Sequence, residues 1–276
     1  MAAELEIVCI GNELLIGKVV NTNASWIGKK ATDLGIKVKR VTVCADDLQE
    51  IASVIREALS RKPKFVITTG GLGPTFDDKT LQGISIALQK KWVVNVEAFR
   101  MVQNKYVEYV KSRNIETPDM TEPRVKMATF PEGTKPLFNP VGTAPGMQAD
   151  IENTVLFALP GVPKEMEAIF ELSVVPLLRQ ASENGGFYQK SIYADNIMES
   201  ILAPLIDKVM QDNCGVYIKS HPKGMENQPH MELHFSILEK NPDRAEALLR
   251  EAVAQMVQLI RENGGKIYPE KHQTDV

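Results

Sequence analysis

The residues best placed to do chemistry are two adjacent aspartates, Asp77 and Asp78, which follow a glycine-rich turn in the stretch VITTGGLGPTFDDKT (66–80). Glycine lets backbone N–H groups approach an anion closely, and a helix starting after the turn would add unpaired donors and a positive dipole end. Two carboxylates beside a bound phosphate would repel it unless a cation lay between them. We therefore predict a site for a phosphate group and a divalent metal ion, Mg²⁺, Mn²⁺ or Co²⁺.

A purely structural role is the alternative for the same stretch. One aspartate would cap the following helix, and the glycines would only make the turn. A cap accounts for one aspartate and leaves the other, together with the Gly-Gly-x-Gly-Pro-Thr cluster, without a purpose. The loop is not a Walker loop, because no Gly-Lys-Ser/Thr follows, nor a dinucleotide G-x-G-x-x-G, because Phe76 stands where the third glycine would be.

The elements that must position this loop form a strand–helix alternation. Strands are predicted at 5–10, 36–43 and 65–69, and an amphipathic helical pattern follows each. Asn21 or Thr22 can cap the first of these helices, and Asp47 begins a capping-box pattern for the second. Such alternation is typical of a parallel sheet with right-handed crossovers, covered by helices on both faces.

Two further acidic residues follow strands of this predicted sheet. Glu13 comes after the first strand and Asp46 after the second. Ligands of such sheets bind beyond the carboxyl ends of the strands, so both side chains should converge with Asp77 and Asp78 on one rim. The plain alternatives are a further cap for Asp46 and a solvated loop position for Glu13.

Two later loops have features of a ligand site. The segment NPVGTAPG (139–146) is rigid because of its Pro and Gly content, and it could be a plain loop or one wall of a site. The strand 154–159 leads into PGVPKEM, where Pro163 suits the first position of a helix. Lys164 would then lie in the first turn, where the helix dipole disfavours a positive charge. We predict that Lys164 meets a phosphate; an exposed lysine is the alternative.

From about residue 185 the pattern changes to a smaller α+β unit with an antiparallel sheet. His230, Glu232 and His234 alternate along one predicted strand and share a face. A solvated face opposite a core face explains this alternation better than a metal site, because the helical H-E-x-x-H zinc motif is absent.

Composition excludes several classes of protein. The chain has 276 residues, enough for one large or two unequal domains, and its net charge of −3 argues against nucleic-acid binding. The sequence contains neither an uninterrupted apolar segment of membrane-spanning length nor a signal-peptide pattern, so we expect no membrane partner and a cytoplasmic location. Cys9, Cys44 and Cys214 are too few and too scattered for a disulfide framework.

Four blocks resemble the molybdopterin-binding-domain superfamily, and specifically its competence-damage-inducible protein A (CinA) branch. They are GNELLIGKVVNTNA (11–24), TTGGLGPTFDDKT (68–80), NPVGTAPGM (139–147) and LPGVPKEM (159–166). The resemblance implies a three-layer α/β/α domain at 1–180 with a mostly parallel sheet, a small α+β domain at 185–276, and a homodimer. It also implies a metal-dependent ADP-ribose pyrophosphatase.

The resemblance also implies roles for single residues. Asp78 matches an aspartate implicated in catalysis in molybdopterin adenylyltransferases, and Asp46 matches a second one less closely. Gln82 stands where many relatives have Glu, which puts that acid's role in doubt or moves it to Asp77. The further domain of bacterial relatives that deamidates nicotinamide mononucleotide is not expected here.

Together these observations predict hydrolysis of the pyrophosphate bond of a nucleoside diphosphate compound, ADP-ribose first, to AMP and ribose 5-phosphate. Molybdopterin adenylyltransfer and non-catalytic binding of molybdopterin or a nucleotide are the alternatives. The expected catalytic residues are Asp46, Asp77 and Asp78, and the expected metal ligands are Glu13, Asp77 and Asp78. The residues expected to bind substrate are Gly70, Gly71, Gly73, Pro74, Thr75, Asn139, Gly142, Thr143, Gly146, Gly161 and Lys164.

Overall fold

A computed structural model describes the chain except for residues 1–2, 112–118, 183–184, 224–229 and 269–276. The chain divides into two compact units. The first comprises Met1–Thr32 and Ile36–Glu183, and the second comprises Asp33–Gly35 and Asn184–Val276.

The first unit is built on a six-stranded sheet with the order β2-β1-β3-β8-β7-β6. Its first four strands in this order are parallel, whereas β7 and β6 run antiparallel to their neighbours. The mostly parallel sheet that the sequence predicted is therefore confirmed. The strands are β1 (Glu4–Ile10), β2 (Lys37–Cys44), β3 (Phe65–Thr69), β6 (Lys135–Leu137), β7 (Gly146–Ile151) and β8 (Thr154–Leu159).

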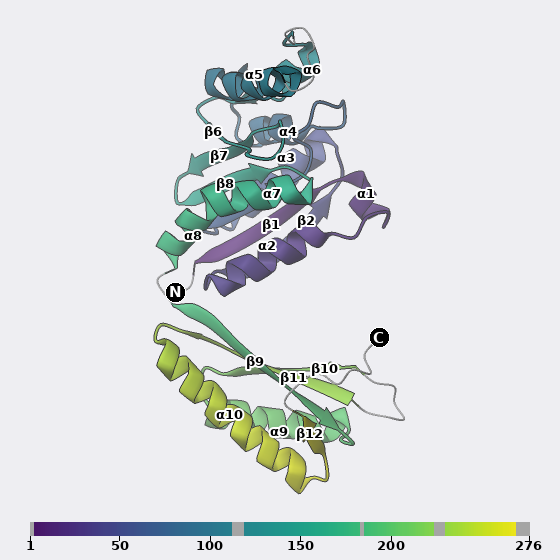
Figure 1. The fold of residues 1–276 in the computed structure, drawn as a ribbon, viewed down its shortest axis with the longest axis vertical. Helices are drawn as coiled ribbons and strands as arrows, with labels where there is room; N and C mark the ends of the chain where they lie inside the picture. The colour runs from purple at the N-terminus through teal and green to yellow at the C-terminus, as the bar shows by residue number, and fades with distance from the viewer. Residues whose placement is uncertain (1–2, 112–118, 183–184, 224–229, 269–276) are drawn as a thin grey trace. The chain divides into compact units, whose positions relative to one another are not determined.

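Helices cover both faces of this sheet and make three layers (Figure 1). Helices α3 and α4 pack together on one face, where the apolar side chains of α3 join alternate buried residues of β1, β3 and β8. Helices α2 and α7–α8 lie on the other face. There Trp26 of α2 packs edge-on against Phe170, with the ring centroids 5.2 Å apart. The helices are α1 (Asn12–Leu15), α2 (Thr22–Asp33), α3 (Leu48–Ser60), α4 (Thr80–Ala87), α5 (Val96–Lys111), α6 (Glu122–Lys126), α7 (Pro163–Ile169) and α8 (Val175–Ala181), with the π-helical turn η1 (Phe170–Val174) between the last two.

Local signals place the helix ends as the sequence predicted. Asp47 caps α3, because its Oδ1 accepts hydrogen bonds from the backbone of Gln49 and Glu50. The Asn21 side chain accepts from the Ala24 backbone at the start of α2, and Pro163 is the first residue of α7. These caps fix where each strand-to-helix loop begins and ends.

Some elements differ from the sequence-based expectation. The segment after β1 contains the one-turn helix α1, which the sequence did not predict and in which no residue is buried. A two-stranded antiparallel sheet of β4 (Trp92–Val94) and β5 (Thr129–Pro131) lies outside the main sheet, and the antiparallel β7 was also not foreseen.

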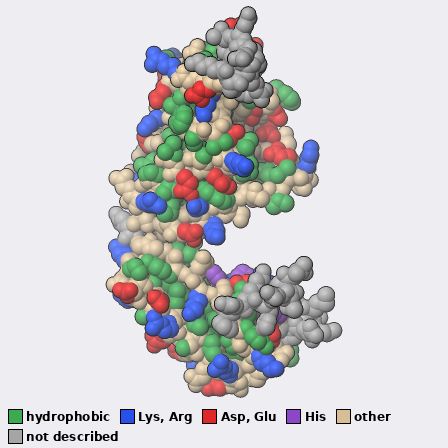
Figure 2. All heavy atoms as spheres, in the orientation of Figure 1, with side chains coloured by type: hydrophobic (Ala, Val, Ile, Leu, Met, Phe, Trp, Pro, Cys, Tyr) green, Lys and Arg blue, Asp and Glu red, His purple; other side chains and the backbone are tan. Residues whose placement is uncertain are grey.

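The second unit is an antiparallel sheet with the order β10-β11-β9-β12, as expected of an α+β unit. Helices α9 and α10 pack on one face, and histidine side chains gather on the side of the sheet away from them (Figure 2). Ser191 donates to Glu232 and contacts His234, while His230 contacts Asp195. Its elements are β9 (Gly186–Asp195), α9 (Glu199–Asp212), β10 (Tyr217–Pro222), β11 (His230–Glu239), α10 (Pro242–Glu262) and β12 (Lys266–Tyr268).

Candidate active site

A cavity of about 570 Å³ opens beyond the carboxyl ends of β1, β3 and β8, where the sequence predicted that a ligand would bind. Acidic side chains gather on this unit beside α1 (Figure 2). The predicted site residues that line the cavity are Glu13, Asp46, Gly70, Gly71, Gly73, Pro74, Asp77, Asp78, Thr143 and Gly161. Those that do not line it are Thr75, Asn139, Gly142, Gly146 and Lys164.

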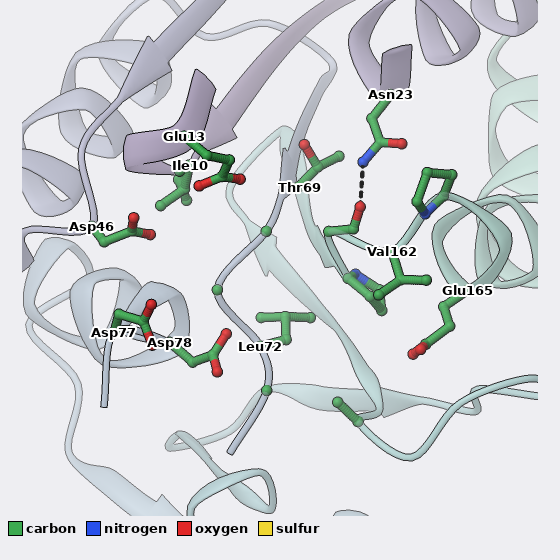
Figure 3. Close-up of a pocket in the computed structure, with 18 of the residues that line it drawn as sticks. Ile10, Glu13, Asn23, Asp46, Thr69, Leu72, Asp77, Asp78, Val162 and Glu165 are labelled. Carbon is green, nitrogen blue, oxygen red and sulfur yellow. Dashed lines mark hydrogen bonds between the residues drawn. The ribbon is translucent and has the colours of Figure 1, made fainter. Parts of the chain in front are cut away.

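The glycine loop that follows β3 forms the floor of the cavity (Figure 3). Gly70 and Gly71 have φ of +100° and +66°, a backbone conformation that favours glycine. The Thr80 hydroxyl donates to the Gly70 carbonyl at 2.7 Å and ties the loop to the start of α4. Within the described part of the chain, the backbone N–H groups at 71, 72 and 73 have no acceptor. Three consecutive free donors in a fixed loop suit an anion.

Asp77 and Asp78 are held by the turn that precedes α4, and neither caps the helix, because its N-cap is Lys79. Asp78 Oδ2 accepts from the Thr75 backbone at 2.9 Å, and the Thr75 hydroxyl lies 2.5 Å from a carboxylate oxygen of each aspartate. That hydroxyl contact is the main reason why the pKa of Asp77 is lowered. Thr75 therefore orients the two carboxylates that line the cavity.

Asp46 lies at the carboxyl end of β2 and is tied to α1. Its Oδ2 accepts a hydrogen bond from the Asn12 backbone at 2.8 Å, which lowers the pKa of the carboxyl. Burial outweighs this bond and raises the pKa, and repulsion from Glu13, Asp77 and Asp78 raises it further. The four carboxylates, predicted from three separate segments of the chain, therefore line one cavity (Figure 3).

Two lysines beside the aspartates were missed by sequence reasoning. Lys79 Nζ donates to the Asp46 carbonyl at 3.0 Å, and Lys126 Nζ donates to the Thr75 carbonyl. Burial lowers the pKa of Lys126, and attraction to Asp78 and Asp77 opposes that shift. Lys79 adjoins the motif and could have been found there, whereas Lys126 comes from α6 and carries no local signal.

Lys164, predicted to meet a phosphate, is exposed and does not line the cavity, whereas its neighbour Glu165 does. Asn139 and Gly142 lie behind Glu165: the Asn139 amide donates to Glu165 Oε2 at 2.7 Å. Gly146 is buried within β7. Asn139 and Gly142 thus support the wall rather than form its surface.

The acidic residues suit a cation that is shared with a ligand. The described residues contain no group of three or more His, Cys, Asp or Glu side chains able to hold a metal ion by themselves. Mg²⁺ commonly binds through one or two carboxylates plus substrate phosphates and retains several waters. In this cavity Asp77 and Asp78 would supply the carboxylate ligands of such a cation. The free N–H groups of the glycine loop would hold the phosphates that supply its other ligands.

Comparison with known proteins shows the family to which the chain belongs. The model of the probable molybdopterin binding domain matches residues 6–180, which is more than half of the chain and includes all four acidic residues. The chain belongs to this molybdopterin-binding-domain family. The match spans the six-stranded sheet and every loop that lines the cavity.

One solved structure supports the CinA branch of the molybdopterin-binding-domain family, and two further relatives match most of the chain. The crystal structure of the protein CinA of Thermoplasma acidophilum, a protein of unknown function, has a TM-score of 0.58 and 39% identity, covering 64% of this chain and 98% of that one. A protein of Metallosphaera sedula is 42% identical over 95% of this chain and 96% of its own length. A protein of Pyrobaculum calidifontis is 45% identical over 92% of this chain and 95% of its own length.

In the described residues, no helix has the length and apolar character needed to cross a bilayer.

Proposed function

We propose that the chain hydrolyses the pyrophosphate bond of a nucleoside diphosphate compound, with ADP-ribose as the first candidate, yielding AMP and ribose 5-phosphate. The observation that carries this proposal is one cavity in which a glycine loop with free N–H donors faces Glu13, Asp46, Asp77 and Asp78. A diphosphate is the ligand that needs both features, because it takes donors directly and reaches carboxylates only through a cation.

The residues of the chain would divide the work as follows. The amides at 71–73 bind and orient the diphosphate, and Lys79 and Lys126 offset the charge of Asp77 and Asp78. Asp46, whose pKa is raised by burial, accepts a proton from the attacking water. A divalent cation held by Asp77 and Asp78, with help from Glu13, would lower the pKa of a bound water and neutralise charge on the leaving phosphate.

The family description favours molybdopterin-related binding as a second candidate. A pterin with a phosphate could use the same loop, either as an acceptor of an adenylyl group or as bound cargo. Three incubations separate these functions: ADP-ribose, FAD, and ATP with molybdopterin, each with and without Mg²⁺, Mn²⁺ or Co²⁺. AMP and ribose 5-phosphate from ADP-ribose support the proposal, adenylylated pterin supports adenylyl transfer, and the absence of any product supports a binding protein.

The Asp78→Ala variant tests the assignment of residues within the proposed reaction. We expect its rate of ADP-ribose hydrolysis to fall by about 100-fold or more, the usual contribution of a positioned catalytic group. Asp150→Ala, an exposed carboxylate in β7 outside the cavity, should keep the wild-type rate. A wild-type rate in purified Asp78→Ala with the metal present would show the assignment to be wrong.

A further inference from the structure

Glu165 forms part of the cavity wall away from the other four carboxylates. It lies in the first turn of α7, half-buried, and Figure 3 shows it across the 70–73 loop from Asp46, Asp77 and Asp78. Its placement apart from the other acids indicates that it meets a different portion of the ligand.

The Glu165 carboxylate is held by one buried side chain. Asn139, only 3% exposed, donates from Nδ2 to Glu165 Oε2 at 2.7 Å and to the Ala144 carbonyl at 2.9 Å. Its Oδ1 accepts from the backbone of Val141 and Gly142 at 3.0 and 2.7 Å. Both donors and the acceptor of the amide are used, so Asn139 cannot rotate without losing bonds.

Gly142 makes room for this carboxylate, because a Cβ there would overlap Glu165 Oε2 and Cδ. Glu165 Oε1 contacts no hydrogen-bond donor or cation within the described part of the chain. The carboxylate is therefore fixed through one oxygen, while the other has no partner among the described residues, and the residue lines the cavity. A ligand donor would complete it without any rearrangement.

The loop that leads into α7 lies directly against the glycine loop. A Cβ at Gly161 would lie 3.3 Å from Gly70 Cα, and Asn23 Nδ2 donates to the Gly161 carbonyl at 2.8 Å. Glu165 thus lines the same cavity as the glycine loop, and its negative charge would repel phosphate oxygens. In a nucleoside diphosphate the group attached to the phosphates is ribose, whose vicinal hydroxyls are donors that a carboxylate accepts well.

We propose that Glu165 accepts hydrogen bonds from the ribose hydroxyls of the bound nucleotide and so selects ribonucleotides over their deoxy analogues. This role rests on the proposed function, since it takes the diphosphate to lie in the glycine loop. Asn139 and Gly142 are positioning residues that act through Glu165.

The test is a comparison of ADP with 2′,3′-dideoxy-ADP by titration calorimetry in the presence of Mg²⁺, on the wild type and Glu165→Gln. The wild type should bind ADP about tenfold or more tightly, as expected for hydrogen bonds to a charged acceptor. In Glu165→Gln the amide oxygen would take the Asn139 donor and turn its NH₂ toward the ligand, so the ADP preference should fall to about threefold or less. Glu165→Gln should bind dideoxy-ADP at least as tightly as the wild type does, because the substitution removes the repulsion between the carboxylate and the phosphates.

Glu167→Gln, on the same helix but outside the cavity, is the matched control and should keep the wild-type preference. Equal affinities of the wild type for the two nucleotides, or an unchanged preference in Glu165→Gln, would overturn the role of Glu165. If the wild type hydrolyses ADP-ribose but shows no preference, only this role fails. If it binds neither nucleotide, the proposed function fails as well.

Discussion

At the scale of one residue, Asp46 shows that clustering acidic side chains round a cavity lowers the stability of the folded protein. Its pKa is raised by burial and by the three neighbouring carboxylates, even though the Asn12 backbone donates to it. A carboxyl with a raised pKa in the folded protein makes the native state less stable at neutral pH. Such an arrangement is expected where a site is shaped for a ligand rather than for stability.

The Asp46→Asn variant should therefore be as stable as the wild type at pH 7 or more stable, by up to about 1 kcal/mol, because solvent screens a partly exposed charge. Asparagine keeps an acceptor for the Asn12 backbone. Hydrolysis of ADP-ribose should fall in the same variant. Thermal unfolding and a rate assay measure the two effects; a clear loss of stability at pH 7 would contradict the electrostatic account.

The raised pKa of Asp46 also predicts how the stability of the two proteins changes with pH. Between its unfolded and its raised folded pKa, Asp46 binds more protons in the native state than in the unfolded chain, so wild-type stability falls as pH rises through that window. The stability advantage of Asp46→Asn should be largest at neutral pH and disappear below the unfolded pKa. An advantage that grows on acidification would contradict it.

At the scale of elements, the contact between α3 and α4 fixes the helix that follows Asp77 and Asp78. Gly83 of α4 faces Ile51 of α3, and a Cβ at position 83 would lie 2.5 Å from Ile51 Cγ2, which is fully buried. The close approach depends on the missing side chain. Because Thr80 ties α4 to Gly70, this packing also holds the glycine loop.

Gly83→Ala should lower the free energy of unfolding by about 1–3 kcal/mol through overpacking, despite the better helix propensity of alanine. Gly28→Ala is the matched control, because Gly28 is also helical and a Cβ there meets nothing within 4 Å. It should raise stability by about 0.5–1 kcal/mol. Denaturant unfolding measures both variants, and equal effects would show that α3 and α4 do not pack this closely.

Elements with a local signal were the ones that the sequence could predict. The caps at Asp47 and Asn21 and the proline that opens α7 are determined within a few residues. The small sheet of β4 and β5 joins residues far apart in the chain, so no local pattern announces it. Helix α1 is a single exposed turn without an apolar face, which leaves periodicity nothing to detect.

At the scale of the whole molecule, sheet topology explains which site residues were predictable. Glu13, Asp46 and the aspartate pair each follow a strand of the parallel part of the sheet. The carboxyl ends of parallel strands meet at one edge, so these side chains come together there. Lys126 reaches the aspartates through tertiary packing, which a single sequence does not encode locally. The dipole argument for Lys164 identified the correct turn of α7, but the structure places the adjacent Glu165 in the cavity wall. The homodimer stays a prediction that light scattering would test.

The central claim is that Asp77 and Asp78 hold a divalent cation that recruits a diphosphate to the glycine loop. The most direct measurement is titration calorimetry of ADP with and without Mn²⁺, on the wild type and on an Asp77→Asn, Asp78→Asn double variant with unchanged thermal stability. Mn²⁺ should tighten ADP binding to the wild type by about tenfold or more, or roughly 1.4 kcal/mol, and should have no such effect on the variant. ADP affinity that Mn²⁺ leaves unchanged in the wild type, or strengthens equally in the variant, would contradict the claim.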